Sequence, residues 1–223
     1  MKIADLFYSI QGEGSLVGVP SAFVRLSGCN LRCHWCDTPY TSWKPTGEEM
    51  SLARIVEEVR AFETNHVVVT GGEPMLFQEV VALTREFRAM GMHITIETAG
   101  TVFRGLECDL MSISPKLANS VPEGPWATQH DRLRIQPGVL SKLMTNYDHQ
   151  LKFVVERPED IEEIRQLLRT VAAEPGRVIL MPEGTDRQVL RERSVWLADI
   201  CKLEGFRFSP RLHVELWGSR RGV

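Results

Sequence analysis

The stretch AFVRLSGCNLRCHWCDT (22–38) joins a β-strand pattern to a loop that holds three of the chain's five cysteines. Cys29, Cys33 and Cys36 directly follow the apolar segment AFVRLS (22–27). Two thiols would suit a disulfide or a redox pair, and four would close a structural zinc site. Three thiols on a loop that leaves a strand therefore indicate a metal centre with one position left for another ligand.

An iron–sulfur cluster explains three cysteines better than zinc does. A cubane cluster usually has four thiolate ligands, so three leave one iron open to a small molecule. The tight spacing argues against three unrelated buried thiols, whereas Cys108 and Cys201 are expected to be ordinary structural cysteines. Structural zinc is the alternative, and it would need a fourth ligand, supplied through the fold by one of the histidines His34, His66, His93 and His213.

Composition is ordinary for a globular protein, with 43% hydrophobic and 25% charged residues and a net charge of −3. No basic stripe is present, so a nucleic-acid partner is not expected. No apolar run approaches the ~20 residues of a membrane span, and the N-terminus lacks a secretory pattern. We therefore expect a cytoplasmic protein with reduced thiols, folded as a single domain over residues 1–223.

Strand patterns alternate with helix patterns along the chain. Apolar runs typical of buried strands occupy 22–27, 66–70, 93–98, 109–114, 151–155 and 177–182. Ser51 is expected to cap the helix after it, and Thr185 with Gln188 to form a capping box for the helix through Leu203. The segment 118–148 is expected to be a loop.

This alternation predicts an α/β fold with a parallel sheet and outer helices. About six core strands are too few for a closed eight-stranded barrel, so we expect an incomplete, opened (β/α) barrel. A doubly wound open sheet is the alternative. In either fold, ligands bind at the carboxyl ends of the strands.

Three further motifs end predicted strands at this same edge. In TGGEP (70–74) the glycines allow close backbone approach to a ligand, and Glu73 offers an acceptor to an ammonium group. In IETAG (96–100), Glu97 is a candidate for holding a ribose hydroxyl. In ISPK (113–116) the candidates for contact with a ribose or a carboxylate are Ser114 and Lys116.

Polar residues near the N-terminus suit a flat heterocycle. In SIQGEG (9–14), Gln11 and Glu13 can pair with the amide and amino edge of a pterin- or guanine-like ring, although a plain hairpin turn is an alternative. Arg25 precedes the cysteine loop, and its planar guanidinium suits a substrate carboxylate.

The C-x3-C-x2-C spacing, with the aromatic Trp35 before the last cysteine, resembles the radical S-adenosylmethionine (SAM) superfamily. Within it, the chain closely resembles the 7-carboxy-7-deazaguanine synthase family. The matching elements, in chain order, are SIQGEG, FVRLSGCNLRCHWCDT, TGGEP, IETAGT, ISPK and LHVELWGSRRGV. The resemblance implies a radical SAM fold. It also implies conversion of 6-carboxy-5,6,7,8-tetrahydropterin to 7-carboxy-7-deazaguanine with loss of ammonia, in the biosynthesis of queuosine and other 7-deazapurines.

The resemblance also assigns ligands to residues. It implies a 4Fe–4S cluster on Cys29, Cys33 and Cys36, and a magnesium ion on Thr38. The residues implied to contact SAM are Trp35, Cys36, Asp37, Gly72, Ser114, Pro115 and Lys116, with Glu73 and Glu97 as further candidates. The residues implied to contact the substrate are Ile10, Gln11, Gly12, Arg25 and Thr70, with Glu13 as a further candidate.

The family resemblance further implies a homodimer and an external electron donor such as flavodoxin or ferredoxin. Two rival functions remain at this point. A radical SAM activase that installs a glycyl radical on a partner enzyme shares the cysteine spacing but needs no pterin pocket. A zinc-binding module without enzymatic activity would hold one zinc ion instead of four irons.

Overall fold

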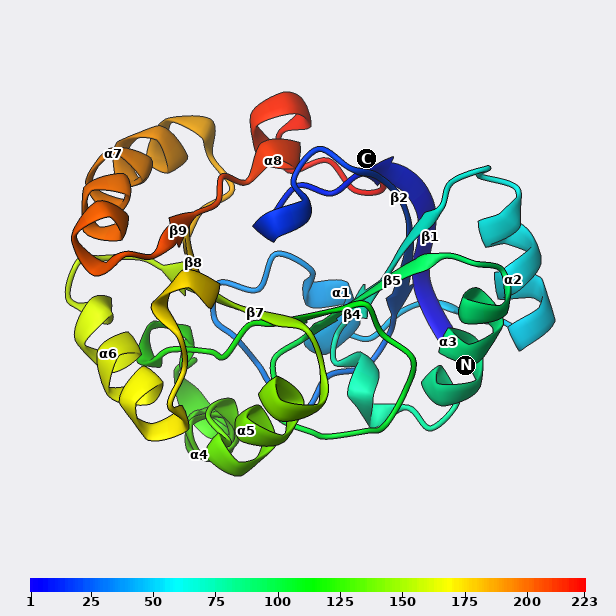
Figure 1. Cartoon of the computed structure of the whole chain (residues 1–223), viewed down its shortest axis with the longest axis horizontal. Helices are drawn as coiled ribbons and strands as arrows, with labels where there is room; N and C mark the ends of the chain where they lie inside the picture. Colours follow the sequence, from blue (N-terminus) through cyan, green and yellow to red (C-terminus); the bar gives the residue numbers. More distant parts are fainter.

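The computed structural model covers all 223 residues and places nine strands in one curved sheet (Figure 1). The strands are β1 (Lys2–Ile10), β2 (Pro20–Leu26), β3 (Glu48–Glu49), β4 (His66–Gly71), β5 (His93–Thr98), β6 (Leu110–Ile113), β7 (His149–Val155), β8 (Val178–Pro182) and β9 (Arg207–Phe208). Their order across the sheet is β3-β1-β2-β4-β5-β6-β7-β8-β9. From β2 to β9 all neighbours are parallel, whereas β1 is antiparallel to β2 and β3.

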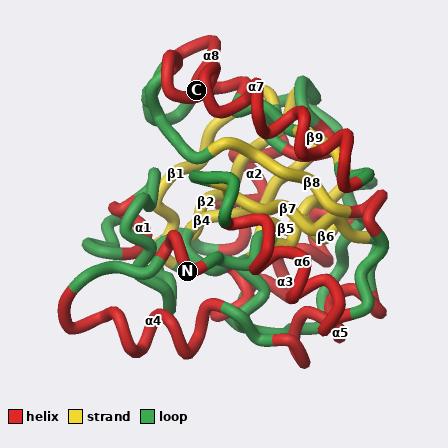
Figure 2. Tube along the Cα trace, turned by 90° about the vertical axis from the view of Figure 1, so that its left-hand side faces the viewer, coloured by secondary structure: helices red, strands yellow, loops and turns green.

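The helices are α1 (Pro39–Ser42), α2 (Leu52–Arg60), α3 (Val80–Ala89), α4 (Ala127–Arg134), α5 (Pro137–Asn146), α6 (Asp160–Val171), α7 (Arg187–Glu204) and α8 (Leu212–Trp217). Those from α2 to α7 lie on the outer side of the sheet, as Figures 1 and 2 show together, whereas α1 lies on its inner side and contributes to the cavity lining. The inner strands are apolar and buried on both faces; every residue of β6 and β8 is buried. No helix has the length and apolar character needed to cross a membrane.

The sheet is an incomplete barrel, as the sequence predicts. Each of the six predicted strands is present, as β2 and β4 to β8. No pairing joins β9 back to β1 or β3, so the barrel stays open along one side. Figure 1 shows α8 and the last residues lying across that side, with the C-terminus beside β1 and β2.

Two local predictions are wrong. The segment 118–148, expected to be a loop, contains α4 and α5. The sequence of α4, ATQHDRLR, has no apolar stripe, and its only buried residue is His130, so hydrophobic periodicity could not reveal it. The capping box of Thr185 and Gln188 is absent, because Asp186 is the N-cap of α7 and accepts hydrogen bonds from two backbone amides.

The predicted cap of α2 is confirmed. Ser51 is its N-cap, and its hydroxyl accepts a hydrogen bond from the backbone amide of Arg54 at 3.3 Å. The helix then buries Ile55 and Val59 against the main core. A local signal and an apolar face agree here, which is why this helix was predictable from sequence.

Candidate active site

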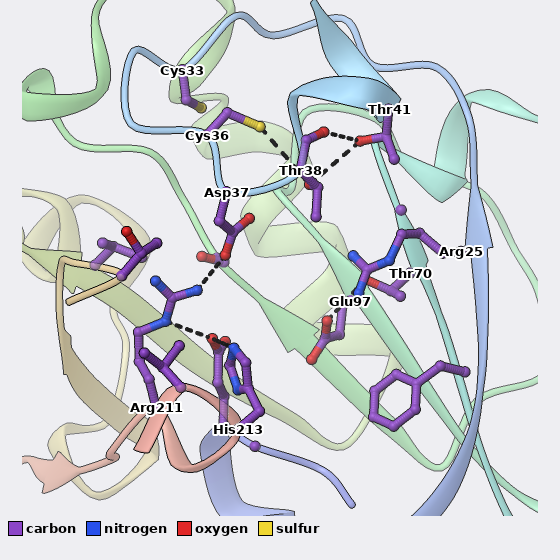
Figure 3. A pocket seen from close by; sticks show the side chains of 18 of the residues that line it. Arg25, Cys33, Cys36, Asp37, Thr38, Thr41, Thr70, Glu97, Arg211 and His213 are labelled. Atoms are coloured by element: carbon purple, nitrogen blue, oxygen red, sulfur yellow. Dashed lines mark hydrogen bonds and ion pairs between the residues drawn. The ribbon is translucent and has the colours of Figure 1, made fainter. Parts of the chain in front are cut away.

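A cavity of about 320 Å³ opens at the carboxyl ends of the parallel strands (Figure 3). This is the edge at which ligands bind in such folds. The predicted site residues that line it are Ile10, Gln11, Gly12, Glu13, Arg25, Cys29, Cys33, Trp35, Cys36, Asp37, Thr38, Thr70, Gly72, Glu97, Ser114 and Lys116. Glu73 and Pro115 do not line it. The fold thus gathers residues from five separate motifs around one cavity.

The cysteine loop lies against apolar side chains. Leu31, Cys33 and Ala99 form a small buried cluster, and Cys29 and Cys36 pack beside it. Burial raises the pKa of Cys29 to about 11 and that of Cys33 to about 12. The charge of Lys116 lowers the pKa of both thiols, but burial has the larger effect, so a bound metal is what would favour the thiolate form.

The donor set fits a cluster better than a single ion. The structure has no group of three or more His, Cys, Asp or Glu side chains that could hold one metal ion. The cysteines share one cavity wall, and thiolates on three corners of a cubane lie farther apart than the ligands of one zinc. Cysteine thiolates are the ligands that hold iron–sulfur clusters, and here the three cysteines lie beside a small apolar cluster.

Two glycines bring the end of β4 against the end of β2. Gly71 has φ +134°, and a Cβ on Gly72 would overlap the carbonyl oxygen of Gly28. The amide of Gly72 donates to Leu26 O at 3.1 Å, and the amide of Glu73 donates to Gly28 O at 2.9 Å. The close approach that the sequence suggested for a ligand is therefore, first of all, an approach to the strand that carries the cysteines.

Glu73 lies beneath the cavity wall. Its side chain is fully buried, and its carboxylate accepts hydrogen bonds from Met75 N at 3.0 Å, Thr98 Oγ1 at 2.8 Å and Ala99 N at 2.8 Å. Burial raises its pKa. The residue ties the end of β4 to the end of β5, and in this arrangement it does not face an ammonium group in the cavity.

Ser114 and Lys116 face the cavity, whereas Pro115 between them does not. Lys116 Nζ donates to Ser114 Oγ at 2.7 Å and lies 5.7 Å from the centre of the Trp35 ring. This cation–π contact places a positive charge beside the cysteine loop.

A buried charged group forms the opposite wall. Lys152 Nζ lies 2.6 Å from Glu13 Oε2, and Arg211 Nε lies 3.2 Å from Glu13 Oε1. Burial alone would raise the pKa of Glu13, but Lys152 and Arg211 lower the pKa of this carboxyl well below its usual range. Burial would likewise lower the pKa of Lys152, but the carboxylates of Glu13 and Glu97 raise it. Both partners are therefore charged at neutral pH.

Glu97 joins Gln11 and Thr70 in one hydrogen-bonded group. Gln11 Nε2 donates to Glu97 Oε1 at 3.2 Å, and Thr70 Oγ1 donates to Glu97 Oε2 at 2.9 Å. Lys152 Nζ lies 3.6 Å from the same carboxylate. The sequence suggested Glu97 as a contact of the ribose, but the fold associates it with two residues expected on the substrate side.

Arg211 and Arg25 each already have an acidic partner. Arg211 bridges Glu13 and Asp37, and its charge lowers the pKa of Asp37 against the effect of burial (Figure 3). Arg25 Nε lies 3.4 Å from Asp5 Oδ2. A substrate carboxylate at Arg25 would therefore share the guanidinium with Asp5.

The C-terminal segment supplies part of the cavity that sequence reasoning missed. Gly218 to Val223 line the cavity, and the amide of Leu212 donates to Gly12 O at 2.9 Å. Arg221 Nε lies 2.7 Å from Asp5 Oδ1, and its guanidinium stacks 4.0 Å from the centre of the Tyr40 ring. These contacts join residues more than 180 positions apart, which no local pattern reveals.

Sequence reasoning also missed Lys152 and Arg211, and it considered His213 only as a zinc ligand; all three line the cavity. One signal was available for Lys152, because it interrupts the apolar run LKFVV on a buried strand. A buried charge inside a strand is costly unless it is paired, so the interruption marks a functional position.

The other candidate ligands lie elsewhere. His66 and His93 pack with ring centres 4.8 Å apart and ring planes tilted by 33°, at the first positions of β4 and β5 and outside the cavity lining. Cys108 and Cys201 are free thiols that do not line the cavity either. Burial raises the pKa of Cys108 to about 12 and that of Cys201 to about 11.

Comparisons with known proteins agree with this geometry. Residues 23–120 match the family model described as the radical SAM superfamily. The chain is 47% identical to the 7-carboxy-7-deazaguanine synthase of Halobacterium salinarum, over 97% of this chain and 90% of that protein. It is 39% identical to the synthase of the same name from Rhodopirellula baltica, over 100% and 89% of the two chains.

A solved structure shares the fold. The crystal structure of QueE from Escherichia coli superimposes with a TM-score of 0.71 at 27% identity, covering 95% of this chain and 94% of that one. The cysteine loop, the open barrel and these near-full-length similarities lead to one assignment. The chain belongs to the 7-carboxy-7-deazaguanine synthase family of the radical SAM superfamily.

Proposed function

We propose that this chain converts 6-carboxy-5,6,7,8-tetrahydropterin to 7-carboxy-7-deazaguanine, releasing ammonia, as a radical SAM lyase of 7-deazapurine biosynthesis. One observation carries the proposal. A single cavity holds the three-cysteine loop on one wall and the polar group of Gln11, Glu13 and Glu97 on another. A glycyl-radical activase or a zinc module would have no use for the second wall.

The radical SAM superfamily uses a 4Fe–4S cluster and SAM as cofactors. In our proposal the cluster is held by Cys29, Cys33 and Cys36. When bound, the cluster and SAM supply the electron and the adenosyl radical that removes hydrogen from the substrate. The remaining work belongs to the protein, which binds, orients and shields the reactants.

We assign SAM to the wall that carries Trp35, Asp37, Gly72, Ser114 and Lys116. Lys116 supplies a charge that suits a carboxylate, and Asp37 supplies an acceptor that suits an ammonium group. Glu73 and Pro115 are both buried and do not line the cavity, so we give these two residues supporting roles instead of direct contacts.

We assign the pterin to the wall of Gln11, Glu13, Thr70 and Glu97, next to Ile10 and Gly12. A pterin edge carries an amino group, a ring N–H and a carbonyl oxygen, which match carboxylate acceptors and amide or ammonium donors. Lys152 places a cation beside both of these carboxylates. Arg25 is our candidate for the substrate carboxylate, which would compete with Asp5.

We further propose that Thr38 binds Mg²⁺. Its hydroxyl lies on the cavity wall, 3.9 Å from the sulfur of Cys36. One hydroxyl is not a complete site, so waters and substrate oxygens must supply the other ligands, as is usual for magnesium.

The partners in this proposal are a second copy of the chain and an external electron donor such as flavodoxin or ferredoxin. All five cysteines are free, which supports a reducing compartment, and we place the reaction in the cytoplasm.

The test is a product assay under anaerobic conditions. Reconstituted protein is mixed with a reductant, SAM, Mg²⁺ and the carboxytetrahydropterin, and product and ammonia are quantified. We expect a deazaguanine chromophore and one ammonia per product. Formation of 5′-deoxyadenosine without that chromophore would favour the activase instead. Cys36→Ala is the control and should form neither the deazaguanine nor 5′-deoxyadenosine.

A further inference from the structure

The cysteine loop is held from outside by the segment 117–134, which the assigned function does not use. Three donors of the loop hydrogen-bond to this segment. The indole of Trp35 donates to Asn119 O at 3.0 Å, and the amide of His34 donates to Ser120 O at 3.0 Å. The amide of Arg32, the residue before Cys33, donates to the side chain of His130.

The hydrogen-bond partners of His130 fix its tautomer. Its Nδ1 lies 3.0 Å from the Arg32 amide, which can only donate. Its Nε2 lies 2.9 Å from Ser120 Oγ, and that hydroxyl donates its own proton to Leu117 O at 2.6 Å. The hydroxyl therefore accepts from Nε2–H, and Nδ1 is left as the acceptor for the loop. The opposite tautomer would set one N–H against another.

Burial makes these contacts costly to lose. His130 is 1% exposed and is the only buried residue of α4, so this otherwise polar helix is anchored through an imidazole. Ser120 is fully buried as well. An unpaired donor at either position would have no water to replace its partner.

The anchoring segment is itself fixed to the barrel. Asn119 Nδ2 donates to Asp160 Oδ2 at 2.7 Å and to Val154 O at 3.2 Å, which ties the segment to α6 and to β7. On the loop side, the guanidinium of Arg32 donates to Cys29 O at 2.8 Å and lies 4.8 Å from the centre of the Trp126 ring. Both partners of the His130 contact are therefore rigidly placed.

We propose that His130 is a positioning residue for the cluster. Through its unprotonated Nδ1 it fixes the loop backbone between Cys29 and Cys33, so that the three sulfurs keep the arrangement that leaves one iron open to SAM. The inference rests on the proposed assignment of the cluster to these three cysteines.

Three substitutions separate this role from mere packing. His130→Asn places an amide oxygen close to the position of Nδ1 and can still accept from Arg32. His130→Gln places its amide near the position of Nε2, and His130→Leu offers no polar atom. His149→Asn is the matched control, because His149 is the first residue of β7 and does not line the cavity.

Each variant is reconstituted anaerobically, checked for its fold by circular dichroism and exposed to an iron chelator. The EPR spectrum of the reduced cluster is recorded with and without SAM. We expect iron loss about tenfold faster in His130→Gln and His130→Leu, the size of effect that one unmade buried hydrogen bond produces. Their response to SAM should be weakened. His130→Asn and His149→Asn should behave like the wild type.

Two outcomes would overturn the proposal. If all three His130 variants keep the wild-type iron loss and SAM response, the contact does not position the cluster. If His130→Asn loses iron as fast as His130→Gln and His130→Leu, then the volume of the ring is what matters, and the hydrogen-bond acceptor at the position of Nδ1 is not. Failure of the underlying assignment gives a different result, because Cys36→Ala would then retain the cluster whatever stands at position 130.

Discussion

At the scale of single residues, the charged group around Glu13 is the least replaceable feature of the cavity. Glu13 and Lys152 have side chains that are 15% and 5% exposed, and their ion pair lies among further buried charges. A buried ion pair contributes little over an apolar pair, but removing one partner leaves the other charge uncompensated. This asymmetry suits a site that must present fixed charges to a polar ring.

Glu13→Gln is expected to lower the free energy of unfolding by about 1–3 kcal/mol near neutral pH, because it removes two charge-assisted contacts while Lys152 keeps Glu97 and Arg211 keeps Asp37. Lys152 and Arg211 hold the folded-state pKa of Glu13 below its ordinary value of 4.5, so the stabilisation is complete above that pH. It is lost as the pH falls through the folded-state value. Urea unfolding of both proteins over a pH series measures the difference, which should shrink only under acidic conditions.

Glu57→Gln, an exposed change on α2, is the control and should alter stability by less than about 0.5 kcal/mol. A Glu13→Gln difference that is absent at neutral pH would show that the charges are not coupled. A difference that grows on acidification would contradict the sign of the pKa shift.

At the scale of elements, the carboxyl ends of the strands position the site residues, and most of these strands were predicted from the sequence. The six inner strands are short, mostly apolar segments, and 66–70 is a continuous apolar run, so they could be predicted directly. Strand β9 has only two residues, both exposed, and α4 is anchored by His130 instead of an apolar stripe. Neither carries the periodic signal on which such predictions depend.

Gly72→Ala tests the junction between β4 and the cysteine loop. The added methyl group would overlap the Gly28 carbonyl and press on Cys29, so we expect a loss of about 1–3 kcal/mol in unfolding free energy. Iron content after reconstitution should also fall. Gly105→Ala, where a Cβ meets nothing within 4 Å, is the matched control. If Gly72→Ala and Gly105→Ala change the free energy of unfolding and the iron content equally, the backbone between β4 and the cysteine loop can move to accept the methyl group.

At the scale of the whole molecule, the C-terminal segment completes a cavity that the open barrel leaves exposed. Arg211 reaches Glu13, and Arg221 reaches Asp5, across nearly the full length of the chain. The motif positions of the cysteines, Gln11 and Arg25 were visible in the sequence. Their partners were not, because such pairs are set by tertiary packing and leave no local periodicity.

Removal of residues 218–223 should therefore affect substrate binding more than the cluster. The truncated protein loses the Arg221 pair with Asp5 and part of the cavity lining. We expect KM for the pterin to rise about tenfold, while iron content and 5′-deoxyadenosine formation without substrate stay unchanged. Steady-state kinetics and iron analysis measure both, and loss of iron with intact KM would contradict this division of roles.

The most direct test of the central claim is the EPR spectrum of the reduced, reconstituted protein recorded with and without SAM. We predict about four irons and four sulfides per chain and a spectrum that changes when SAM is added. Cys36→Ala should remove the signal, whereas Cys108→Ala should leave it intact. The account would be contradicted by a protein with a complete cluster whose EPR spectrum does not change when SAM is added. A protein that holds a single zinc ion instead of the cluster would contradict it as well.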